Sequence, residues 1–352
     1  MPNPDFYPLR IAELRHDPAG AVVLAFDVPD HLKPTYRFMP GQYLTLRAMI
    51  DGHDVRRAYS LCSSPGEARP MVAIKRVPGG VFSNWASAEP RAGDTLSVMT
   101  PEGRFGLMPQ PGATSCYAAF AAGSGITPIL SLIKSLLATE ANSRFFLFYG
   151  NRATDSIMFR AEIEDLKDRY LTRLSVCHVL SREAQDIPVL NGHLDADKIR
   201  LLAAALPPID HAFVCGPQPM IEALPAVLTE LGMRHVHVER FTPATDSAAR
   251  APVVLPDTPP TAIATVTHEG VRVDIPVAEG EAIIDAAIRA GRDLPYSCKG
   301  GMCCTCRAKL LEGRVEMAAN YSLEPWELAA GYVLTCQARP LTDRVTLDFD
   351  QV

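Results

Sequence analysis

The stretch Cys298-Lys-Gly-Gly-Met-Cys-Cys-Thr-Cys306 decides how the C-terminal part of the chain folds. Three of its thiols follow the spacing C-x4-C-x2-C, and Cys336 adds a fourth thiol after 29 intervening residues. Gly300 and Gly301 lie inside the stretch, where glycine lets the backbone bend tightly and bring its amides close to a bound group. The spacing therefore predicts a metal centre, with the ligands Cys298, Cys303, Cys306 and Cys336.

Two kinds of metal centre use four cysteines in this way. The spacing C-x4-C-x2-C with a distant fourth cysteine is that of plant-type [2Fe–2S] loops, whereas zinc sites usually combine a close pair with a second close pair. Here the fourth thiol stands alone on a predicted strand, Val333–Arg339, which favours the cluster over zinc. Cys304 lies outside the spacing, and we interpret it as a spare thiol.

Composition limits the class of protein. The 352 residues are 47% hydrophobic and 21% charged, enough for two or three ordinary domains. A net charge of −6 without a Lys/Arg-rich block argues against nucleic acid as a partner. No run approaches the roughly 18 apolar residues of a membrane helix, and the N-terminus has no signal-peptide pattern. Nine cysteines, an odd number, fit a reducing compartment, so we expect a cytoplasmic protein without structural disulfides.

Residues 1–109 predict a small antiparallel β-barrel. Within it, Gly79-Gly80 leads into a short helical segment at Phe82, whose free backbone amides suit an anionic phosphate, and Arg57 offers a fork of donors for the same group. Tyr59 can lie against a planar ring. Taken singly, each of these residues also has an ordinary structural role. The expected strands are Val22–Phe26, Tyr43–Arg47, Val72–Arg76 and Thr95–Met99.

Residues 110–241 alternate strands with helices, which predicts a doubly wound parallel sheet. The first strand runs into Gly123-Ser-Gly-Ile-Thr-Pro128, where Thr127 is expected to cap the helix Ile129–Leu137 and Pro128 to occupy its first turn. A dinucleotide pyrophosphate suits that helix end, although the third glycine of G-x-G-x-x-G is missing. A second glycine turn follows Cys215. The expected strands are Tyr117–Ala122, Phe145–Tyr149, Leu174–Leu180, His211–Cys215 and His235–Glu239.

A segment rich in Pro, Ala and Thr, residues 242–261, predicts a semi-extended linker. Residues 262–352 then predict strands and one helix around the cysteine loop, an α+β arrangement that resembles the β-grasp fold of a plant-type ferredoxin. Its expected elements are strands Ala262–Val266 and Val271–Val277, joined at Glu269-Gly270, a helix Ala282–Ala290, and strands Arg307–Leu311 and Val333–Arg339.

Taken in chain order, these motifs resemble the ferredoxin–NADP reductase superfamily with a plant-type ferredoxin fused behind it. The residues that carry the resemblance are Arg57-x-Tyr59-Ser60, Gly80-x-x-Ser83, Gly123–Pro128, Cys215-Gly-Pro217 and the four cysteines. Further stretches are similar to reductase components of oxygenases, in particular those of phenylacetyl-CoA epoxidases: Tyr149–Arg152, Glu239–Phe241, Asn320–Pro325 and Tyr332–Cys336.

The resemblance implies positions for two bound nucleotides. FAD would be held by Arg57, Tyr59, Ser60, Ile74, Lys75, Gly80, Val81, Phe82 and Ser83, with Phe241 shielding the other face of its ring. NADPH, the cosubstrate, would contact Gly123, Ser124, Gly125, Thr127, Pro128, Cys215, Gly216, Pro217 and Met220. Arg152, Ser181 and Arg182 would bind the adenosine 2′-phosphate, since Arg recognises phosphate with two parallel hydrogen bonds. Ser60, Cys215 and Glu239 would border the place of hydride transfer. FMN in place of FAD stays open.

The implied function is electron transfer. A reduced nicotinamide gives two electrons as hydride and a [2Fe–2S] cluster takes one at a time, so a flavin between them has a clear role. The resemblance implies a di-iron epoxidase acting on phenylacetyl-CoA as the partner that receives the electrons. The alternatives are another mono- or dioxygenase, such as a steroid or aromatic-ring hydroxylase, and a redox carrier or sensor without steady turnover.

Overall fold

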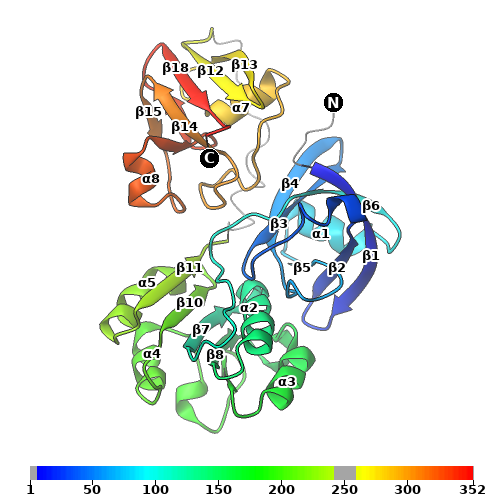
Figure 1. Cartoon of the computed structure of the whole chain (residues 1–352), viewed down its shortest axis with the longest axis vertical. Helices are drawn as coiled ribbons and strands as arrows, with labels where there is room; N and C mark the ends of the chain where they lie inside the picture. Colours follow the sequence, from blue (N-terminus) through cyan, green and yellow to red (C-terminus); the bar gives the residue numbers. More distant parts are fainter. Residues whose placement is uncertain (1–5, 242–258, 352) are drawn as a thin grey trace. The chain divides into compact units, whose positions relative to one another are not determined.

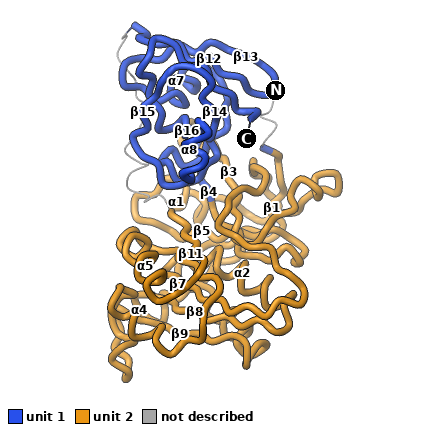
Figure 2. The backbone as a smooth tube through the Cα atoms, turned by 60° about the vertical axis from the view of Figure 1, so that its left-hand side comes forward, with its two compact units in different colours: residues 1–6, 54–58, 242–352 blue, residues 7–53, 59–241 orange. Residues whose placement is uncertain are grey.

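The computed structural model describes residues 6–241 and 259–351, and these form two compact units. The larger unit comprises residues 7–53 and 59–241, and the smaller contains residues 6, 54–58 and 259–351 (Figure 2). The first two predicted modules therefore share one unit, although each has its own sheet. Most of the predicted linker, residues 242–258, lies outside the described residues.

The N-terminal sheet has six strands in the order β4-β3-β6-β1-β2-β5 (Figure 1). The β1–β2, β2–β5 and β3–β6 pairs are antiparallel, and the side chains of Val22, Leu24 and Phe26 on β2 are fully buried. All four expected strands are present, and the structure adds β1 and β4. The elements are β1 (Phe6–Asp17), β2 (Ala21–Asp27), a 3-10 helix (Asp30–Leu32), β3 (Tyr43–Ile50), β4 (His53–Ser60), β5 (Met71–Lys75), α1 (Val81–Ala88) and β6 (Thr95–Met99).

The second sheet is parallel, with five strands in the order β11-β10-β7-β8-β9. Helices α2 and α3 cover one face through Ile129 and Ile163, and α4 and α5 cover the other through Ile199 and Leu224. The doubly wound prediction is therefore confirmed. The elements are β7 (Cys116–Ala122), α2 (Ile126–Thr139), β8 (Arg144–Asn151), α3 (Arg160–Arg169), β9 (Leu174–Leu180), α4 (Ala196–Ala203), β10 (His211–Cys215), α5 (Gln218–Glu230) and β11 (His235–Glu239), with 3-10 helices at Gly123–Gly125, Thr154–Ser156 and Pro188–Leu190.

Buried polar contacts join the two sheets of the larger unit. The Lys134 ammonium on α2 lies 3.2 Å from a Glu67 oxygen and donates to the carbonyl of Cys62 at 3.1 Å. The Asp17 carboxylate, at the end of β1, accepts the amide of Phe159 at 2.9 Å. These bonds fix the N-terminal sheet against the parallel sheet, so that residues from both can line one site.

The smaller unit contains a mixed sheet in the order β13-β12-β18-β14-β16 and a two-stranded ribbon of β15 and β17. Its core includes Ile283, Ile284 and Leu347, and α7 packs inside it as in a β-grasp domain. The elements are β12 (Ala262–His268), β13 (Val271–Val277), α7 (Ile283–Arg289), β14 (Arg307–Glu312), β15 (Val315–Met317), α8 (Pro325–Ala329), β16 (Tyr332–Leu334), β17 (Ala338–Pro340) and β18 (Arg344–Asp348).

The single strand expected at Val333–Arg339 is wrong. It is divided into β16 and β17, and Cys336 lies in the turn between them. The break occurs because the chain makes a tight turn at residues 334–337, in which the amide of Gln337 donates to the carbonyl of Leu334 at 2.8 Å. Thr335 still bonds to the carbonyl of Cys306 through its amide and its hydroxyl, at 3.0 and 2.9 Å, and this holds the turn beside the cysteine loop.

Within residues 6–241 and 259–351, no helix has the length and apolar character that crossing a membrane requires.

Candidate functional site

The glycine turn after β7 lies where the parallel sheet reverses its strand order. From β7 the chain proceeds to β8 on one side, while β10 lies on the other side, and ligands of such sheets bind beyond the carboxyl ends of the strands at this point. A Cβ atom on Gly125 would lie 2.1 Å from the carbonyl oxygen of Cys215. Only glycine fits there, because the turn after β7 touches the backbone at the end of β10.

The second glycine turn is packed against the first. A Cβ atom on Gly216 would lie 2.8 Å from the terminal methyl of Met220 and 3.2 Å from the Cβ of Ala122. Pro217 caps α5 and leaves its first amides free of any side-chain cap. The structure thus brings the predicted nucleotide-binding residues of both turns together.

The expected role of Thr127 as a helix cap is wrong. Helix α2 begins at Ile126, three residues earlier than expected, and Gly125 is its N-cap. Both Thr127 and Pro128 therefore lie in the first turn of the helix, a place that was expected for Pro128 but not for Thr127. The buried Thr127 hydroxyl donates to the carbonyl of Ser124 at 3.0 Å. The helix starts early because the 3-10 turn Gly123–Gly125 runs directly into it.

Ser60, Cys215 and Glu239 meet at one place. The Ser60 hydroxyl donates to the Glu239 carboxylate at 3.1 Å, and Cys215 and Glu239 are paired in the β10–β11 register. Burial raises the pKa of Glu239 to about 8. Burial and the nearby Glu239 carboxylate both raise the pKa of the Cys215 thiol. The site therefore combines a neutral thiol with a carboxyl group that gains or loses a proton near neutral pH.

The predicted flavin residues of the larger unit surround the start of α1. Gly80 is its N-cap and no side chain caps the helix, so its first amides remain available to an anion. The Ser83 hydroxyl accepts the amide of Val77 at 3.2 Å, and the rings of Tyr59 and Phe82 lie 5.6 Å apart. Val81 follows Gly80 on the helix, and Ile74 is buried on β5.

Lys75, beside Ile74 on β5, faces the glycine turn after β7. Its ammonium nitrogen lies 3.9 Å from the position that a Cβ atom on Gly123 would occupy. Burial and the charge of Arg152 lower the pKa of Lys75. A lysine held this close to the turn can contribute positive charge to a phosphate bound there.

Two further predicted flavin residues, Arg57 and Phe241, make contacts of their own. The Arg57 guanidinium donates to the carbonyl of Arg56 at 2.7 Å, and residues 54–58 belong to the smaller unit. The place of Arg57 beside α1 therefore remains a prediction. Phe241, the last described residue before the gap, is partly buried against the core that contains Cys215.

Arg152, Ser181 and Arg182 lie together at the carboxyl ends of β8 and β9. The amide of Ser181 donates to the carbonyl of Asn151 at 3.0 Å, and the amide of Arg182 to that of Arg152 at 2.7 Å. Both arginine side chains are exposed. The backbone ladder therefore places two guanidinium groups beside the Ser181 hydroxyl, where an anionic group of a nucleotide can bind.

The four predicted cluster cysteines form two pairs. A hydrogen bond with Cys303 lowers the pKa of Cys298 to about 5, and a hydrogen bond with Cys306 lowers the pKa of Cys336. In the part of the chain that the structure describes, no three Cys, His, Asp or Glu side chains are arranged around a single metal position. Two thiol pairs suit a binuclear cluster in which each iron takes two thiolates.

Backbone groups and one amide side chain support this loop. The amide of Gly300 donates to the Cys298 sulfur at 3.3 Å, and the Gln337 amide donates to the Cys336 sulfur at 3.5 Å. The carbonyl of Gly301 accepts the Tyr321 amide at 3.0 Å and the Ser322 hydroxyl at 3.1 Å. Donors directed at thiolate sulfurs are what a cluster site requires.

A buried ion pair fixes α8 to the strand that follows the loop. Arg307, next to Cys306, is paired with the fully buried carboxylate of Glu327 on α8. The guanidinium carbon of Arg307 also lies 4.9 Å from the centre of the Tyr332 ring. Neither Glu327 nor Tyr332 was identified from the sequence as part of the support, since their partners are remote in the chain.

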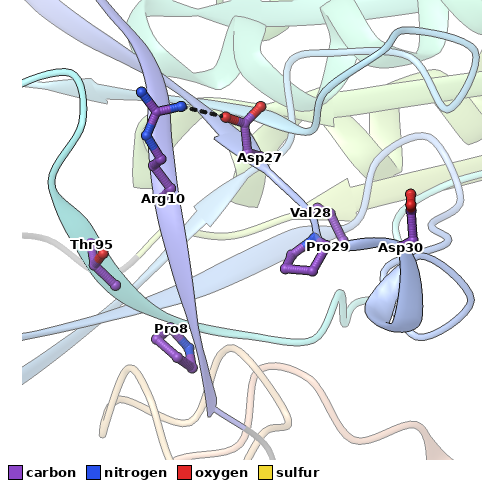
Figure 3. Close-up of a pocket in the computed structure, with 7 residues that line it drawn as sticks. All are labelled: Pro8, Arg10, Asp27, Val28, Pro29, Asp30 and Thr95. Carbon is purple, nitrogen blue, oxygen red and sulfur yellow. Dashed lines mark hydrogen bonds and ion pairs between the residues drawn. The ribbon is translucent and has the colours of Figure 1, made fainter.

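An open depression lies on the N-terminal sheet, between β1, β2 and the start of β6. Its volume is about 680 Å³, and it is lined by Pro8, Arg10, Asp27, Val28, Pro29, Asp30 and Thr95 (Figure 3). Two of its charged side chains neutralise each other, since the Arg10 guanidinium lies 3.0 Å from an Asp27 carboxylate oxygen. None of the predicted cofactor residues lines it, so we assign it no role.

Comparison with known families identifies all three parts of the chain. Residues 18–106 match the oxidoreductase FAD-binding domain, residues 120–225 the oxidoreductase NAD-binding domain, and residues 266–341 the 2Fe-2S iron-sulfur cluster binding domain. The chain thus belongs to the family of ferredoxin–NADP-reductase-type electron-transfer reductases with a fused [2Fe–2S] domain. It is an NAD(P)H-dependent oxidoreductase that uses FAD and a [2Fe–2S] cluster, of the kind that serves as the reductase component of oxygenase systems.

Relatives match from end to end. The chain is 46% identical to one of the subunits of the 1,2-phenylacetyl-CoA epoxidase of Escherichia coli, over 98% of both chains. It is 36% identical to the ferredoxin reductase component of the 3-ketosteroid-9-alpha-monooxygenase of Rhodococcus rhodochrous, over 97% of this chain and 96% of that one. Phthalate dioxygenase reductase has the same fold, with a TM-score of 0.60 at 23% identity over 98% of both chains.

Proposed function

We propose that this chain is the reductase component of a phenylacetyl-CoA epoxidase and that its electrons go to a di-iron oxygenase component. The observation that carries the proposal is the 46% identity to the Escherichia coli epoxidase protein over 98% of both chains, against 36% to the ketosteroid monooxygenase reductase. We further propose NADPH as the preferred donor and the cytoplasm as the location.

The residue assignments are part of this proposal. The amides of Gly123, Ser124 and Gly125 would hold the nicotinamide nucleotide, together with Thr127, Pro128 and the turn at Gly216. The amides at Gly80 would hold the flavin pyrophosphate, with Tyr59 and Ser60 against the ring. Cys298, Cys303, Cys306 and Cys336 would hold the cluster, in the two pairs described above.

The roles of the residues near the hydride follow from their geometry. FAD, when bound, accepts a hydride and releases its electrons one at a time. Cys215 is small, fully buried and neutral, so it leaves room for a nicotinamide ring without adding charge. Ser60 and Glu239 are linked by a hydrogen bond, and with a pKa of about 8 the carboxyl can hold a proton beside the reacting ring. Phe241 would cover the flavin ring when the nicotinamide is absent.

Reconstitution tests the acceptor. The full-length protein, NADPH and a purified phenylacetyl-CoA epoxidase complex should consume phenylacetyl-CoA, and the full-length Cys306→Ser variant should reduce a flavin-directed dye yet fail to support epoxidation. A parallel reaction with the oxygenase component of a 3-ketosteroid-9-alpha-monooxygenase provides the comparison. Faster support of the ketosteroid oxygenase than of the epoxidase would overturn the proposal.

A further inference from the structure

The hydroxyl of Tyr149 is hydrogen-bonded to the glycine turn after β7, residues 123–125. Tyr149 is fully buried on β8, and its hydroxyl donates to the carbonyl of Gly123 at 2.8 Å. Gly123 has a φ of +54°, the left-handed conformation that lets the chain leave β7 and enter the 3-10 turn. Burial raises the pKa of the Tyr149 phenol, which therefore remains a donor at any physiological pH. One hydrogen bond thus fixes the first peptide of the turn.

Asn151, two residues further along β8, has a buried amide with unused hydrogen-bonding capacity. Its residue is 9% exposed, and its Nδ2 has no acceptor among the described residues that satisfies hydrogen-bond geometry. Its backbone carbonyl is used separately, by the amide of Ser181. A buried donor without an acceptor is unfavourable in a folded protein, so its presence at a ligand site points to an acceptor on the ligand.

The register of the sheet places Asn151 beside the turn. Ala122 on β7 is paired with Gly150 on β8, so Asn151 is level with Gly123. Residues alternate between the two faces of a strand, and Asn151 therefore shares the face of Tyr149, whose hydroxyl reaches Gly123. The amide and the phenol stand on the same side of the sheet, at its carboxyl edge.

The order of the strands indicates which part of a dinucleotide lies there. Cys215 and Glu239, at the hydride end, terminate β10 and β11, while Ser181 and Arg182, at the adenosine end, follow β9. β8 lies between β7 and β9 in the sheet. A dinucleotide that spans the carboxyl edge from β10 to β9 must cross β8 with its middle part, the pyrophosphate and the riboses joined to it.

We propose that Asn151 is a nucleotide-binding residue whose side-chain amide donates to the pyrophosphate–ribose part of NAD(P)H, and that Tyr149 is a positioning residue that holds the Gly123 turn for the same ligand. The proposal rests on the nucleotide orientation proposed above. It concerns binding of the electron donor only, so its failure would leave the assignment of the oxygenase acceptor untouched.

Asn151→Leu separates a ligand-binding role from a structural one. Leucine has nearly the same size and removes a buried Nδ2 donor that has no acceptor in good hydrogen-bond geometry, so the nucleotide-free protein should melt at the same or a higher temperature. Nucleotide binding should weaken about tenfold, since the ligand loses one donor and meets an apolar group. A residue needed only for folding would show the opposite result, with lower stability and unchanged binding.

Ligands of graded length locate the contact. Binding is measured by titration calorimetry with NADP⁺, with 2′-phospho-ADP-ribose and with 2′-AMP, which lacks the pyrophosphate; the corresponding unphosphorylated series is used if the wild type oxidises NADH faster. Asn151→Leu should weaken binding of the first two ligands and leave the third unchanged. Equal binding of all three to the variant and the wild type, or weakening confined to 2′-AMP, would overturn the role of Asn151.

Tyr149→Phe tests the turn, with Tyr117→Phe as the matched control. Tyr117 is another buried tyrosine of the same sheet, and it lies on β7 at the end of the strand opposite to the glycine turn. Its hydroxyl donates to the Glu140 carboxylate at 2.8 Å. Tyr149→Phe should raise the KM for NAD(P)H about two- to tenfold with little change in kcat at saturation. Tyr117→Phe should leave KM unchanged. If Tyr149→Phe and Tyr117→Phe had the same KM for NAD(P)H, the positioning role of Tyr149 would be rejected.

Discussion

The glycine turn after β7 and the cysteine loop before β14 are both short loops proposed to hold a cofactor, but they are held in different ways. The turn is fixed by contacts within the protein, because Gly125 lies against the carbonyl of Cys215 and the carbonyl of Gly123 accepts the Tyr149 hydroxyl. The cysteine loop is held at its edges by Tyr321, Ser322 and Thr335, while its centre consists of two thiol pairs.

The difference concerns what each loop needs before it can function. A turn shaped by close backbone contacts is ready for its ligand before the ligand arrives. A loop whose centre is four thiols acquires its final geometry from the metal, and metal binding then contributes to the stability of the domain. Substitutions in the cysteine loop should therefore impair cluster binding, whereas substitutions in the glycine turn should impair stability and use of the nucleotide.

The largest effect is expected at the cluster ligands. Cys303→Ser should abolish cluster assembly, with loss of iron, acid-labile sulfide and the visible absorption of the cluster, while the flavin is still reduced by NADPH. Cys304→Ser is the adjacent control. Cys304 has a φ of +57° and packs at the edge of the core, and serine adopts that geometry equally well. Retention of the cluster in Cys303→Ser with loss in Cys304→Ser would reverse the ligand assignment.

The next effect is expected at the glycine turn. Gly125→Ala places a methyl 2.1 Å from the Cys215 oxygen, so the backbone must move, at a cost of about 3 kcal/mol or more. Thermal unfolding of the larger unit and NADPH oxidation with a dye should both be impaired, while iron content is retained. Gly66→Ala is the control, because a Cβ atom there meets only the Ser64 hydroxyl oxygen at 3.8 Å. Equal stability of the two variants would show that the turn is not fixed by packing.

A smaller effect is expected at the adenosine end. Arg182→Ala should raise the KM for NADPH about ten- to a hundredfold, equivalent to roughly 1.5–3 kcal/mol, because a charge-assisted bond to the 2′-phosphate is lost. The KM for NADH should change little. Arg200→Ala, an exposed arginine on α4, provides the control. If the wild type used both nucleotides with the same kcat/KM, this preference would be rejected.

The smallest effect concerns three histidines on β10 and β11. His211 and His237 are joined through ring nitrogens 3.2 Å apart, and His235 stacks on His211. Burial and the neighbouring imidazoles lower the pKa of His237 to about 4. The folded state therefore resists protonation, so stability that is present above about pH 6.5 is lost as the pH falls toward 4.

Because the His237 ring is partly exposed, we expect this loss to be on the order of 1 kcal/mol. Denaturant unfolding of the larger unit between pH 7 and pH 4 measures it. The slope should flatten in His237→Gln and persist in His53→Gln, which changes an exposed histidine. An unchanged slope in His237→Gln would assign the acid sensitivity to other groups.

Strong periodic patterns made much of the fold predictable. Three parallel strands, β9, β10 and β11, have the predicted boundaries, since each is a short run followed by a clear turn or helix signal. β4 was missed because His53, Asp54, Arg56 and Arg57 give it a polar composition that strand propensity disfavours. Cys336 was placed on a strand because the turn that ends β16, from Leu334 to Gln337, contains no glycine or proline that would indicate it.

The site shows the same limit. Glycine turns and cysteine spacing are local signals, so both loops were found from the sequence. In the sequence, Tyr149 and Asn151 stand out only as part of a stretch similar to oxygenase reductases. Their individual roles depend on strand register and on a hydrogen bond from β8 to the turn after β7, which the sequence does not show. A buried amide without a partner can be recognised only once the fold is known.

The ion pair between Arg307 and Glu327 has a consequence for how the cell could distinguish complete from incomplete protein. Arg307 follows Cys306 directly, so without the proposed cluster the segment that neutralises a fully buried carboxylate would be held less firmly. A buried charge without its partner is strongly destabilising. Helix α8, whose Trp326 is already exposed, would then detach and become accessible to proteases. Limited proteolysis should therefore cut chains without iron at α8 before it cuts chains that carry the cluster.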